Sequence, residues 1–109
     1  MEIEMDIEIY KKLCHDETIV MTRHARQRLV ERNIALDDVE HAIRTGRIIE
    51  EYPNDTPFPS CLILGDSENR KPLHIVASTD NEFLYIITAY HPDPQKWSED
   101  YSVRKEPEA

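Results

Sequence analysis

The residues best able to do chemistry lie in one short segment, Thr22–Arg32, which contains a histidine and several arginines. On a helix, His24, Arg28 and Arg32 fall at positions i, i+4 and i+8, so their side chains form one row beside the apolar face. A row of cations can hold an anion such as a phosphate, because a guanidinium group binds two of its oxygens at once. The same row can instead be neutralised by carboxylates of the protein itself.

Three residues near the end of the chain complete the candidates for a reaction on a phosphodiester. Metal-free RNA cleavage needs a base for the 2′-hydroxyl proton, an acid for the leaving oxygen and cations for the transition-state charge. Histidine titrates near neutral pH, arginine carries a fixed charge, and tyrosine can hydrogen-bond or stack on a base. The candidate catalytic residues are therefore His24, Arg28, His74 and Tyr90, and the candidate substrate-binding residues are Arg32 and Thr88.

Each candidate also has a structural alternative. His24 can hydrogen-bond a neighbouring strand. For Arg32, an internal ion pair with Glu50 or Glu51 is favoured over substrate binding. His74 and Tyr90 stand among apolar residues, where such side chains are commonly packed with their polar atoms bonded.

The remaining titratable residues give no motif. The sequence His91-Pro92-Asp93 indicates a turn at the end of a strand. We expect no metal site and no cofactor, because no recognisable ligand spacing links the possible ligands, which are Cys61, His74, His91 and Asp93.

Composition indicates one domain spanning residues 1–109. The chain is 39% hydrophobic and 32% charged, and it has no apolar run long enough to cross a membrane. The N-terminus alternates acidic and apolar residues, unlike a secretion signal, so we expect a cytoplasmic protein. Cys14 and Cys61 lack CxxC spacing and are expected to be buried, reduced thiols.

The net charge of −9 is unevenly distributed. Residues 20–47 carry six Lys and Arg against four acids, whereas the segments on both sides are acidic. A protein that grips nucleic acid nonspecifically is usually basic. Any contact with RNA must therefore be local or made through a partner such as the ribosome. The negative field also suits a basic partner protein.

The hydrophobic spacing predicts helices followed by strands. Residues 2–15 have helical spacing, although a strand is also possible there, and 19–21 form a short strand candidate. Thr22 is a suitable N-cap for a helix through Asn33. A second helix is expected over residues 36–45, with Gly46 in the C′ position that ends it.

After Gly46 the pattern predicts four strands, over residues 47–52, 60–64, 73–79 and 83–91. A proline-rich loop, a polar turn over residues 65–71 and a two-residue turn at Asp80-Asn81 would join them. That last turn places His74 opposite Ile87, with Thr88 and Tyr90 on the other face, unless a bulge shifts the register. After Pro94 we expect a fraying polar tail, with only Trp97 folded back onto the body.

The whole pattern resembles the bacterial family of domains of unknown function numbered 4258, DUF4258. The resemblance covers residues 20–97. It lies in His24-x3-Arg28-x3-Arg32-x-Ile34, Val39-x2-Ala42-Ile43-x2-Gly46-x-Ile48-Ile49, Tyr52, Pro72-Leu73-His74-Ile75-Val76, Ile87-Thr88-x-Tyr90 and Trp97. The chain departs from it at Ala35, where a Ser or Thr helix cap is usual, and in its acidic segment over residues 1–16.

The resemblance implies a RelE-like toxin fold. We therefore expect an α+β protein with a small antiparallel sheet of about four strands and two to three N-terminal helices on one face. It also implies the toxin half of a toxin–antitoxin pair, a metal-independent endoribonuclease-like protein neutralised by an antitoxin. The alternative is a non-catalytic module of the same fold that binds a basic protein through its acidic surface.

Overall fold

Three helices and five strands make up the part of the chain that the computed structural model describes, residues 5–106. The fold is α+β. In chain order the elements are α1 (Ile7–Lys12), β1 (Ile19–Met21), α2 (Arg23–Glu31), α3 (Leu36–Thr45), β2 (Arg47–Tyr52), β3 (Ser60–Asp66), β4 (Pro72–Thr79) and β5 (Leu84–Tyr90).

The sheet is mixed, not purely antiparallel as expected. Its strand order is β1-β5-β4-β3-β2, and every neighbouring pair is antiparallel except β1 and β5, which are parallel. The expected short strand over residues 19–21 is confirmed, and it joins the sheet as a fifth strand. Because the connection from β1 to β5 contains both α2 and α3, it is long enough for the crossover that a parallel pair requires.

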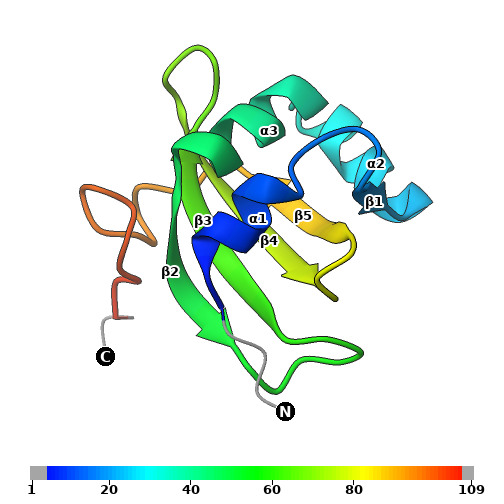
Figure 1. Cartoon of the computed structure of the whole chain (residues 1–109). Coiled ribbons are helices and arrows are strands. Elements are labelled where there is room, and N and C mark those ends of the chain that lie inside the picture. Colours follow the sequence, from blue (N-terminus) through cyan, green and yellow to red (C-terminus); the bar gives the residue numbers. More distant parts are fainter. Residues whose placement is uncertain (1–4, 107–109) are drawn as a thin grey trace.

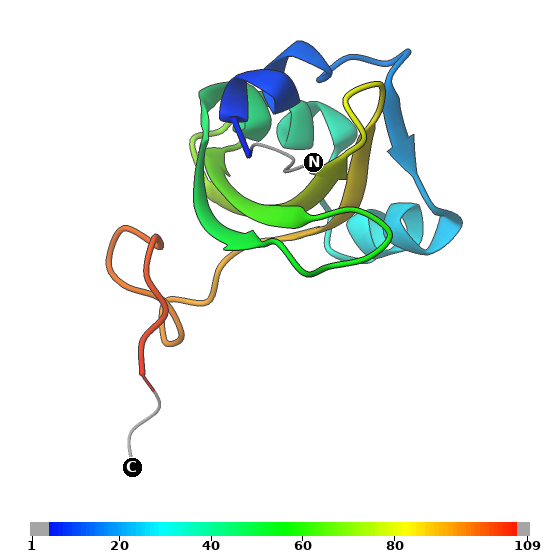
Figure 2. The same cartoon turned by 60° about the horizontal axis from the view of Figure 1, so that its bottom comes forward.

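Helices α1 and α3 lie on one side of the sheet and the C-terminal segment on the other, while α2 lies at the edge formed by β5 and β1. The sheet curls around α1 and α3, and the segment that follows β5 leaves on the outer side (Figures 1 and 2). Between α3 and the sheet lies a core in which Val39, Ile43, Ile63 and Ile75 are fully buried. Each such side chain contributes roughly 1.5–3 kcal/mol relative to an exposed one. This core fixes α3 on the sheet.

The helix ends are set by local hydrogen bonds. The Thr22 hydroxyl accepts a bond from the Ala25 amide at 3.0 Å, which confirms it as the N-cap of α2. Beyond α2, Asn33 turns the chain with φ 55°. Helix α1 is shorter than expected, because the Asp6 carboxylate caps it by accepting from the Glu8 amide at 2.9 Å. Residues 5–6 and 13–15 of the expected first helix are not helical, and residues 2–4 lie outside the described residues.

Both positions occupied by glycine have no room for a side chain. Gly46 ends α3, as expected, but it is the C-cap and not the C′ residue, and its φ of −96° and ψ of −178° are an extended conformation open to any residue. A Cβ at Gly46 would instead lie 2.5 Å from the Ala42 carbonyl oxygen. Gly65 lies inside β3, not in the expected turn, and a Cβ there would overlap the same carbonyl. Glycine thus lets α3 lie against the sheet backbone.

We predict that Gly65→Ala lowers the free energy of unfolding by about 1–3 kcal/mol, because backbone atoms must move to admit the methyl group. Chemical denaturation of both proteins measures this difference. Asn69→Ala, in the exposed turn nearby, is the control and should change stability by less than about 0.5 kcal/mol. Equal stability of Gly65→Ala and the parent would contradict the close approach of α3.

The hairpin between β4 and β5 has a different register from the one expected. Thr79 pairs with Leu84, so the loop has four residues and not two. The Asp80 carboxylate stabilises it by accepting from the amides of Glu82 and Phe83 at 2.9 and 2.8 Å. A bulge next to Val76 and Ala77 then leaves Ile87 unpaired. His74 consequently lies opposite Tyr90, not Ile87.

The chain after Pro94 is folded through residue 106. Trp97 is buried, as expected, and forms an isolated bridge with Arg104. Ser98 donates its amide to the Val103 carbonyl at 2.7 Å. These contacts make residues 93–106, called here the C-terminal strap, a closed loop where a fraying tail was expected. None of the helices in residues 5–106 has the length and apolar character needed to cross a bilayer.

Candidate functional site

His74 is the centre of a cluster on the outer face of the sheet. Its side chain is fully buried, because the ring of Trp97 packs edge-on at 4.3 Å between centroids and that of Tyr90 at 5.3 Å. The Nδ1 atom lies 3.3 Å from the Tyr90 hydroxyl, and Nε2 lies 2.8 Å from the Tyr101 carbonyl oxygen. The cluster therefore joins β4, β5 and the C-terminal strap.

These two contacts determine the proton arrangement. A carbonyl oxygen can only accept, so Nε2 of His74 carries the proton and donates to Tyr101. Nδ1 is then an acceptor, and the Tyr90 hydroxyl donates to it. Burial lowers the pKa of His74 below its ordinary value, although the Tyr101 carbonyl acts in the opposite direction. His74 is therefore neutral near pH 7.

Tyr90 is half-buried between two arginines. Burial raises the pKa of its hydroxyl above the ordinary value, while the positive charges of Arg104 and Arg32 act to lower it. The hydroxyl proton is directed at His74, so the outer lone pairs of the oxygen remain available to another group. Of the pair, Tyr90 is the member that is partly open to solvent.

Arg32 reaches the same face from the end of α2. Its NH1 donates to the Thr88 hydroxyl at 3.0 Å and to the Ala89 carbonyl at 2.8 Å. The expected ion pair of Arg32 with Glu50 or Glu51 is wrong. Those glutamates lie on β2, at one edge of the sheet, whereas α2 packs against β5 and β1 at the other.

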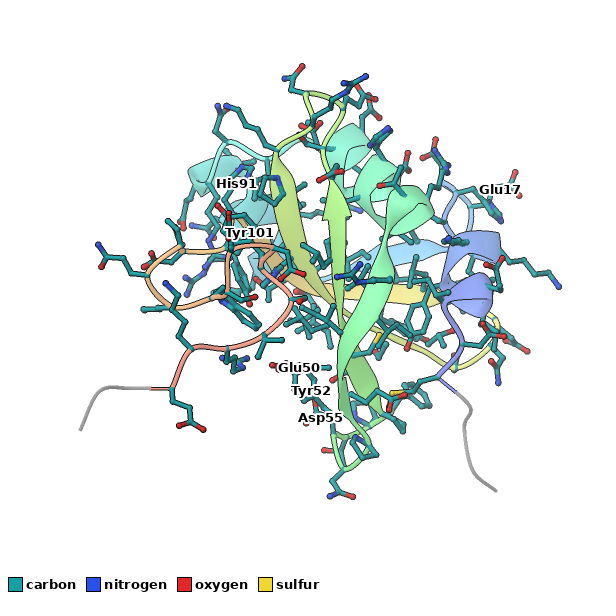
Figure 3. All side chains as sticks on the ribbon, turned by 90° about the vertical axis from the view of Figure 1, so that its left-hand side faces the viewer. Glu17, Glu50, Tyr52, Asp55, His91 and Tyr101 are labelled. Atoms are coloured by element: carbon teal, nitrogen blue, oxygen red, sulfur yellow. The ribbon has the colours of Figure 1, made fainter. Side chains whose placement is uncertain are left out.

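Glu50 instead anchors the C-terminal strap. It accepts from the Tyr52 hydroxyl at 2.6 Å, and Nε of Arg104 lies 2.9 Å from its Oε2. Burial acts to raise the pKa of Glu50, but the bonds from Tyr52 and Arg104 outweigh it and lower that pKa. The Arg104 guanidinium also stacks 4.6 Å from the Trp97 ring centre. Figure 3 views this side of the molecule, with Glu50, Tyr52 and Tyr101 labelled.

The six predicted site residues thus divide into two groups. Arg32 contacts Thr88, His74 contacts Tyr90, and the two pairs share the outer face of β4 and β5. His24 and Arg28 instead contact each other, with Nε of Arg28 donating to Nε2 of His24 at 3.3 Å on the exposed side of α2. Of the row on α2, none of His24, Arg28 and Arg32 makes an ion pair with a carboxylate within residues 5–106. The cationic row therefore stays open to an anion.

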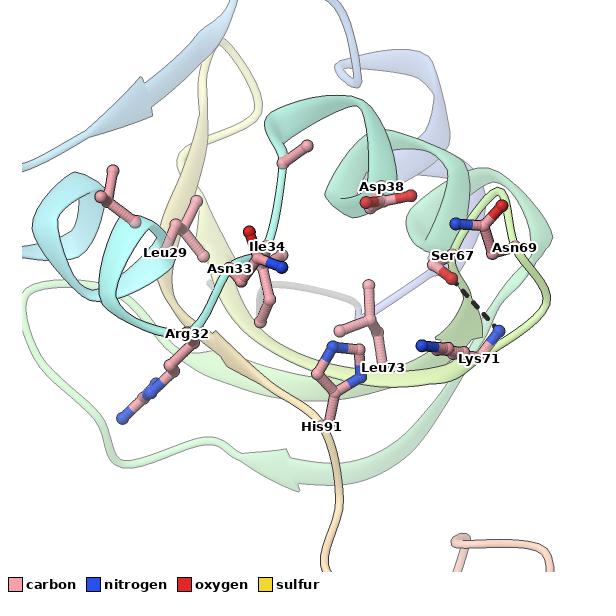
Figure 4. A pocket seen from close by; sticks show the side chains of 12 residues that line it. Leu29, Arg32, Asn33, Ile34, Asp38, Ser67, Asn69, Lys71, Leu73 and His91 are labelled. Atoms are coloured by element: carbon pink, nitrogen blue, oxygen red, sulfur yellow. Dashed lines mark hydrogen bonds between the residues drawn. The ribbon is translucent and has the colours of Figure 1, made fainter.

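Two basic residues that the sequence did not single out lie in a cleft near Arg32. The cleft has a volume of about 700 Å³ and includes Lys71 and His91, which point toward one another (Figure 4). The sequence indicated a turn at His91 and included this residue among possible metal ligands without a recognisable ligand spacing, and it placed Lys71 only in a polar turn. Lys71 directly precedes β4 and His91 directly follows β5, so both lie at the same end of this antiparallel pair. Strand ends, where loops and site residues gather, were the available signal.

The cysteines do not form a reactive site. Cys14 and Cys61 are both buried and free, as the sequence predicted. Burial raises the pKa of each thiol to about 11, which disfavours the nucleophilic thiolate. Within residues 5–106 no three His, Cys, Asp or Glu side chains come close enough together to hold a metal ion.

Comparison with known families identifies the family of the chain. Residues 21–91 match the family described as Domain of unknown function (DUF4258). The chain belongs to the DUF4258 family. No curated protein and no solved structure matches it. The DUF4258 match includes the cationic row, the His74–Tyr90 pair and His91, and it ends before Trp97 and Arg104, so the C-terminal strap lies outside the matched region.

We predict that His74→Gln reduces the pH dependence of stability between pH 7 and pH 5. The unfolded chain binds a proton at His74 near pH 6.5, whereas the folded pKa is lower, so the parent loses stability as the pH falls through this window. Denaturation at both pH values measures the loss. His15→Gln, at an exposed histidine, should retain the parent's pH dependence. An unchanged loss in His74→Gln would contradict a buried neutral His74.

Proposed function

We propose that the chain is the toxin component of a bacterial toxin–antitoxin pair, with a RelE-like fold and a metal-independent endoribonuclease activity. The family resemblance supports the fold, as does a sheet with helices on one face. The observation that carries the activity is the contact between His74 and the Tyr90 hydroxyl beside the guanidinium of Arg32. A base, a partly exposed hydroxyl and an unpaired cation are thereby gathered on one surface.

The arrangement suits attack of an RNA 2′-oxygen on the adjacent phosphorus. The Tyr90 oxygen takes the 2′-hydroxyl proton as its own proton passes to Nδ1 of His74, so the tyrosine ends neutral and the imidazole becomes charged. The 2′-oxygen forms a bond to phosphorus, the bond to the 5′-oxygen breaks, and the leaving 5′-oxygen takes a proton from water. The products are a 2′,3′-cyclic phosphate and a free 5′-hydroxyl, and the charged imidazole returns its proton to solvent through Tyr90. Arg32 stabilises the charge that develops on the phosphoryl oxygens. Neutral His74 behind Tyr90 is the form that this step requires.

Another basic residue of α2 can contact the RNA beside Arg32. Arg28 continues the row of Arg32 along α2. Its Nε donates to His24, and its other N–H groups can donate to neighbouring phosphates. With a net charge of −9, long-range attraction for RNA is absent, so recognition depends on this local row or on delivery by the ribosome. The acidic surface elsewhere suits a basic antitoxin.

One observation favours the second candidate, a non-catalytic module that binds a basic protein. Both ring nitrogens of His74 are hydrogen-bonded, and its ring is sealed from solvent by Trp97 and Tyr101. In this second candidate, His74 serves only to hold the outer face together. The two candidates differ in whether the Tyr90 hydroxyl is needed for anything beyond stability.

We predict that induced expression of the chain arrests bacterial growth and that Tyr90→Phe relieves the arrest. Loss of the hydroxyl breaks the proton path to His74 and should slow RNA cleavage about 100-fold or more. Growth and the integrity of RNA incubated with purified protein, alone and with ribosomes, are the measurements. Arg32→Ala should have an effect of similar size, since it removes the cation that stabilises the transition state.

Tyr85→Phe is the matched control for this test. Tyr85 lies on the same strand, and its hydroxyl donates to Asp80 at 2.8 Å, away from His74. This variant should arrest growth like the parent. Harmless expression together with intact RNA, alone and with ribosomes, would exclude the ribonuclease and leave the binding module.

A further inference from the structure

The cleft that contains Lys71 and His91 is separate from the Tyr90 cluster. It opens on the helix side of the sheet, between the α2–α3 connection and the β3–β4 turn, at the end of β5. Its floor is apolar and consists of the buried side chains Leu29, Ile34 and Leu73. Its walls are polar, with Asn33 and Asp38 facing Asn69 and Ser67 across the opening (Figure 4).

One end of the cleft is positively charged. Lys71 and His91 are exposed and point toward one another, and Lys71 makes no ion pair within residues 5–106 (Figure 4). Nδ1 of His91 donates to the Pro72 carbonyl at 3.1 Å, so this bond fixes the ring and leaves Nε2 free. The Lys71 ammonium group can donate to the oxygens of a phosphate, and Nε2 of His91 can donate to them in the protonated, imidazolium form of the ring.

The other end of the cleft offers hydrogen-bond donors and acceptors and includes the carboxylate of Asp38. Asn33 and Asn69 each carry one amide group, which can both donate and accept. One oxygen of Asp38 is engaged by the Glu68 amide at 3.0 Å. Its other oxygen can accept from a sugar hydroxyl or from the amino group of a base. A ligand that fits must therefore combine a phosphate, an apolar flat body and polar edges.

We propose that this cleft binds one nucleotide of the RNA substrate. The base lies on Leu29, Ile34 and Leu73, its edge meets the amides of Asn33 and Asn69, and its phosphate lies between Lys71 and His91. Side chains of this kind recognise unpaired bases, whose edges and faces are free. The proposal rests on the proposed function and names the substrate as single-stranded RNA.

The end of β5 connects this cleft to the Tyr90 cluster. Tyr90 and His91 are consecutive, and they serve the outer face and the cleft respectively. Arg32 borders the cleft, while its guanidinium is directed away from it, toward Thr88 and the Ala89 carbonyl (Figure 4). A strand that leaves the cleft across this edge brings its next phosphate to Arg32 and Tyr90.

The test is binding of a short single-stranded RNA oligonucleotide whose 2′-oxygens are methylated, so that it cannot be cleaved. Titration of the full chain is followed by the chemical shifts of its backbone amides. We expect shifts at Asn33, Lys71 and His91. Lys71→Ala and His91→Ala should each weaken binding about tenfold or more, since each removes a side chain that can donate to the phosphate. Lys12→Ala and His15→Ala, at exposed positions elsewhere, should bind like the parent.

Several outcomes would overturn the proposal. The first is chemical-shift changes outside the cleft only, and the second is binding by the Lys71→Ala variant that equals binding by the parent. The third is inorganic phosphate that binds as tightly as the oligonucleotide, since the base would then contribute nothing. The result is independent of cleavage. Binding in the cleft without cleavage of natural RNA would refute the ribonuclease activity but not nucleotide binding in the cleft. Cleavage that Lys71→Ala and His91→Ala do not affect would refute nucleotide binding in the cleft but not the ribonuclease activity.

Discussion

The register of the β4–β5 hairpin is the constraint on which the outer face depends. One unpaired residue, Ile87, moves every later residue of β5 by one position against β4. Because side chains alternate between faces, this single shift brings Tyr90 to the face that carries His74. The same shift places Thr88 where Arg32 can reach it from α2. Without the bulge, the imidazole and the phenol would lie on opposite sides of the sheet.

The end of β5 carries residues of both proposed sites, one on each face of the sheet. Strand β4 pairs with β5 as far as Tyr90, whereas β1 pairs with it only over residues 84–86, so the pairing with β4 fixes the direction of the Tyr90 side chain. His91 follows immediately, and its ring is oriented by the Pro72 carbonyl. A rigid strand end thus presents a phenol on one face and an imidazole on the other. The helix α2 closes this edge because the Ala89 carbonyl accepts from Arg32.

Much of the fold follows from local patterns in the sequence. The bounds of α3 and the Thr22 cap are confirmed, since apolar spacing and capping are local properties. The hairpin register is not local in this sense. Asp80-Asn81 suggests a two-residue turn, but the Asp80 carboxylate instead bonds two later amides and lengthens the loop. Nothing in the spacing of the apolar residues distinguishes the bulge at Ile87 from a regular strand.

The site shows the same division. The residue types of the His74–Tyr90 pair were evident from the sequence, but their contact depends on the register and could not be derived. The bond from Arg104 to Glu50 joins residues 54 positions apart, and so does not appear in any periodicity. The pairing of Lys71 with His91 likewise needs the β4–β5 strand pair in place. Long-range pairs are fixed by the assembled sheet, whereas sequence patterns report on one element at a time.

The position of Trp97 gives the molecule a built-in optical reporter. It is the only tryptophan of the chain, so all indole fluorescence comes from this one ring. That ring is enclosed by His74 on one side and Arg104 on the other. Detachment of the C-terminal strap would transfer the indole from a dry setting to water and redden its emission. A spectrometer can therefore follow whether the outer face is covered while any partner is added, with no label attached.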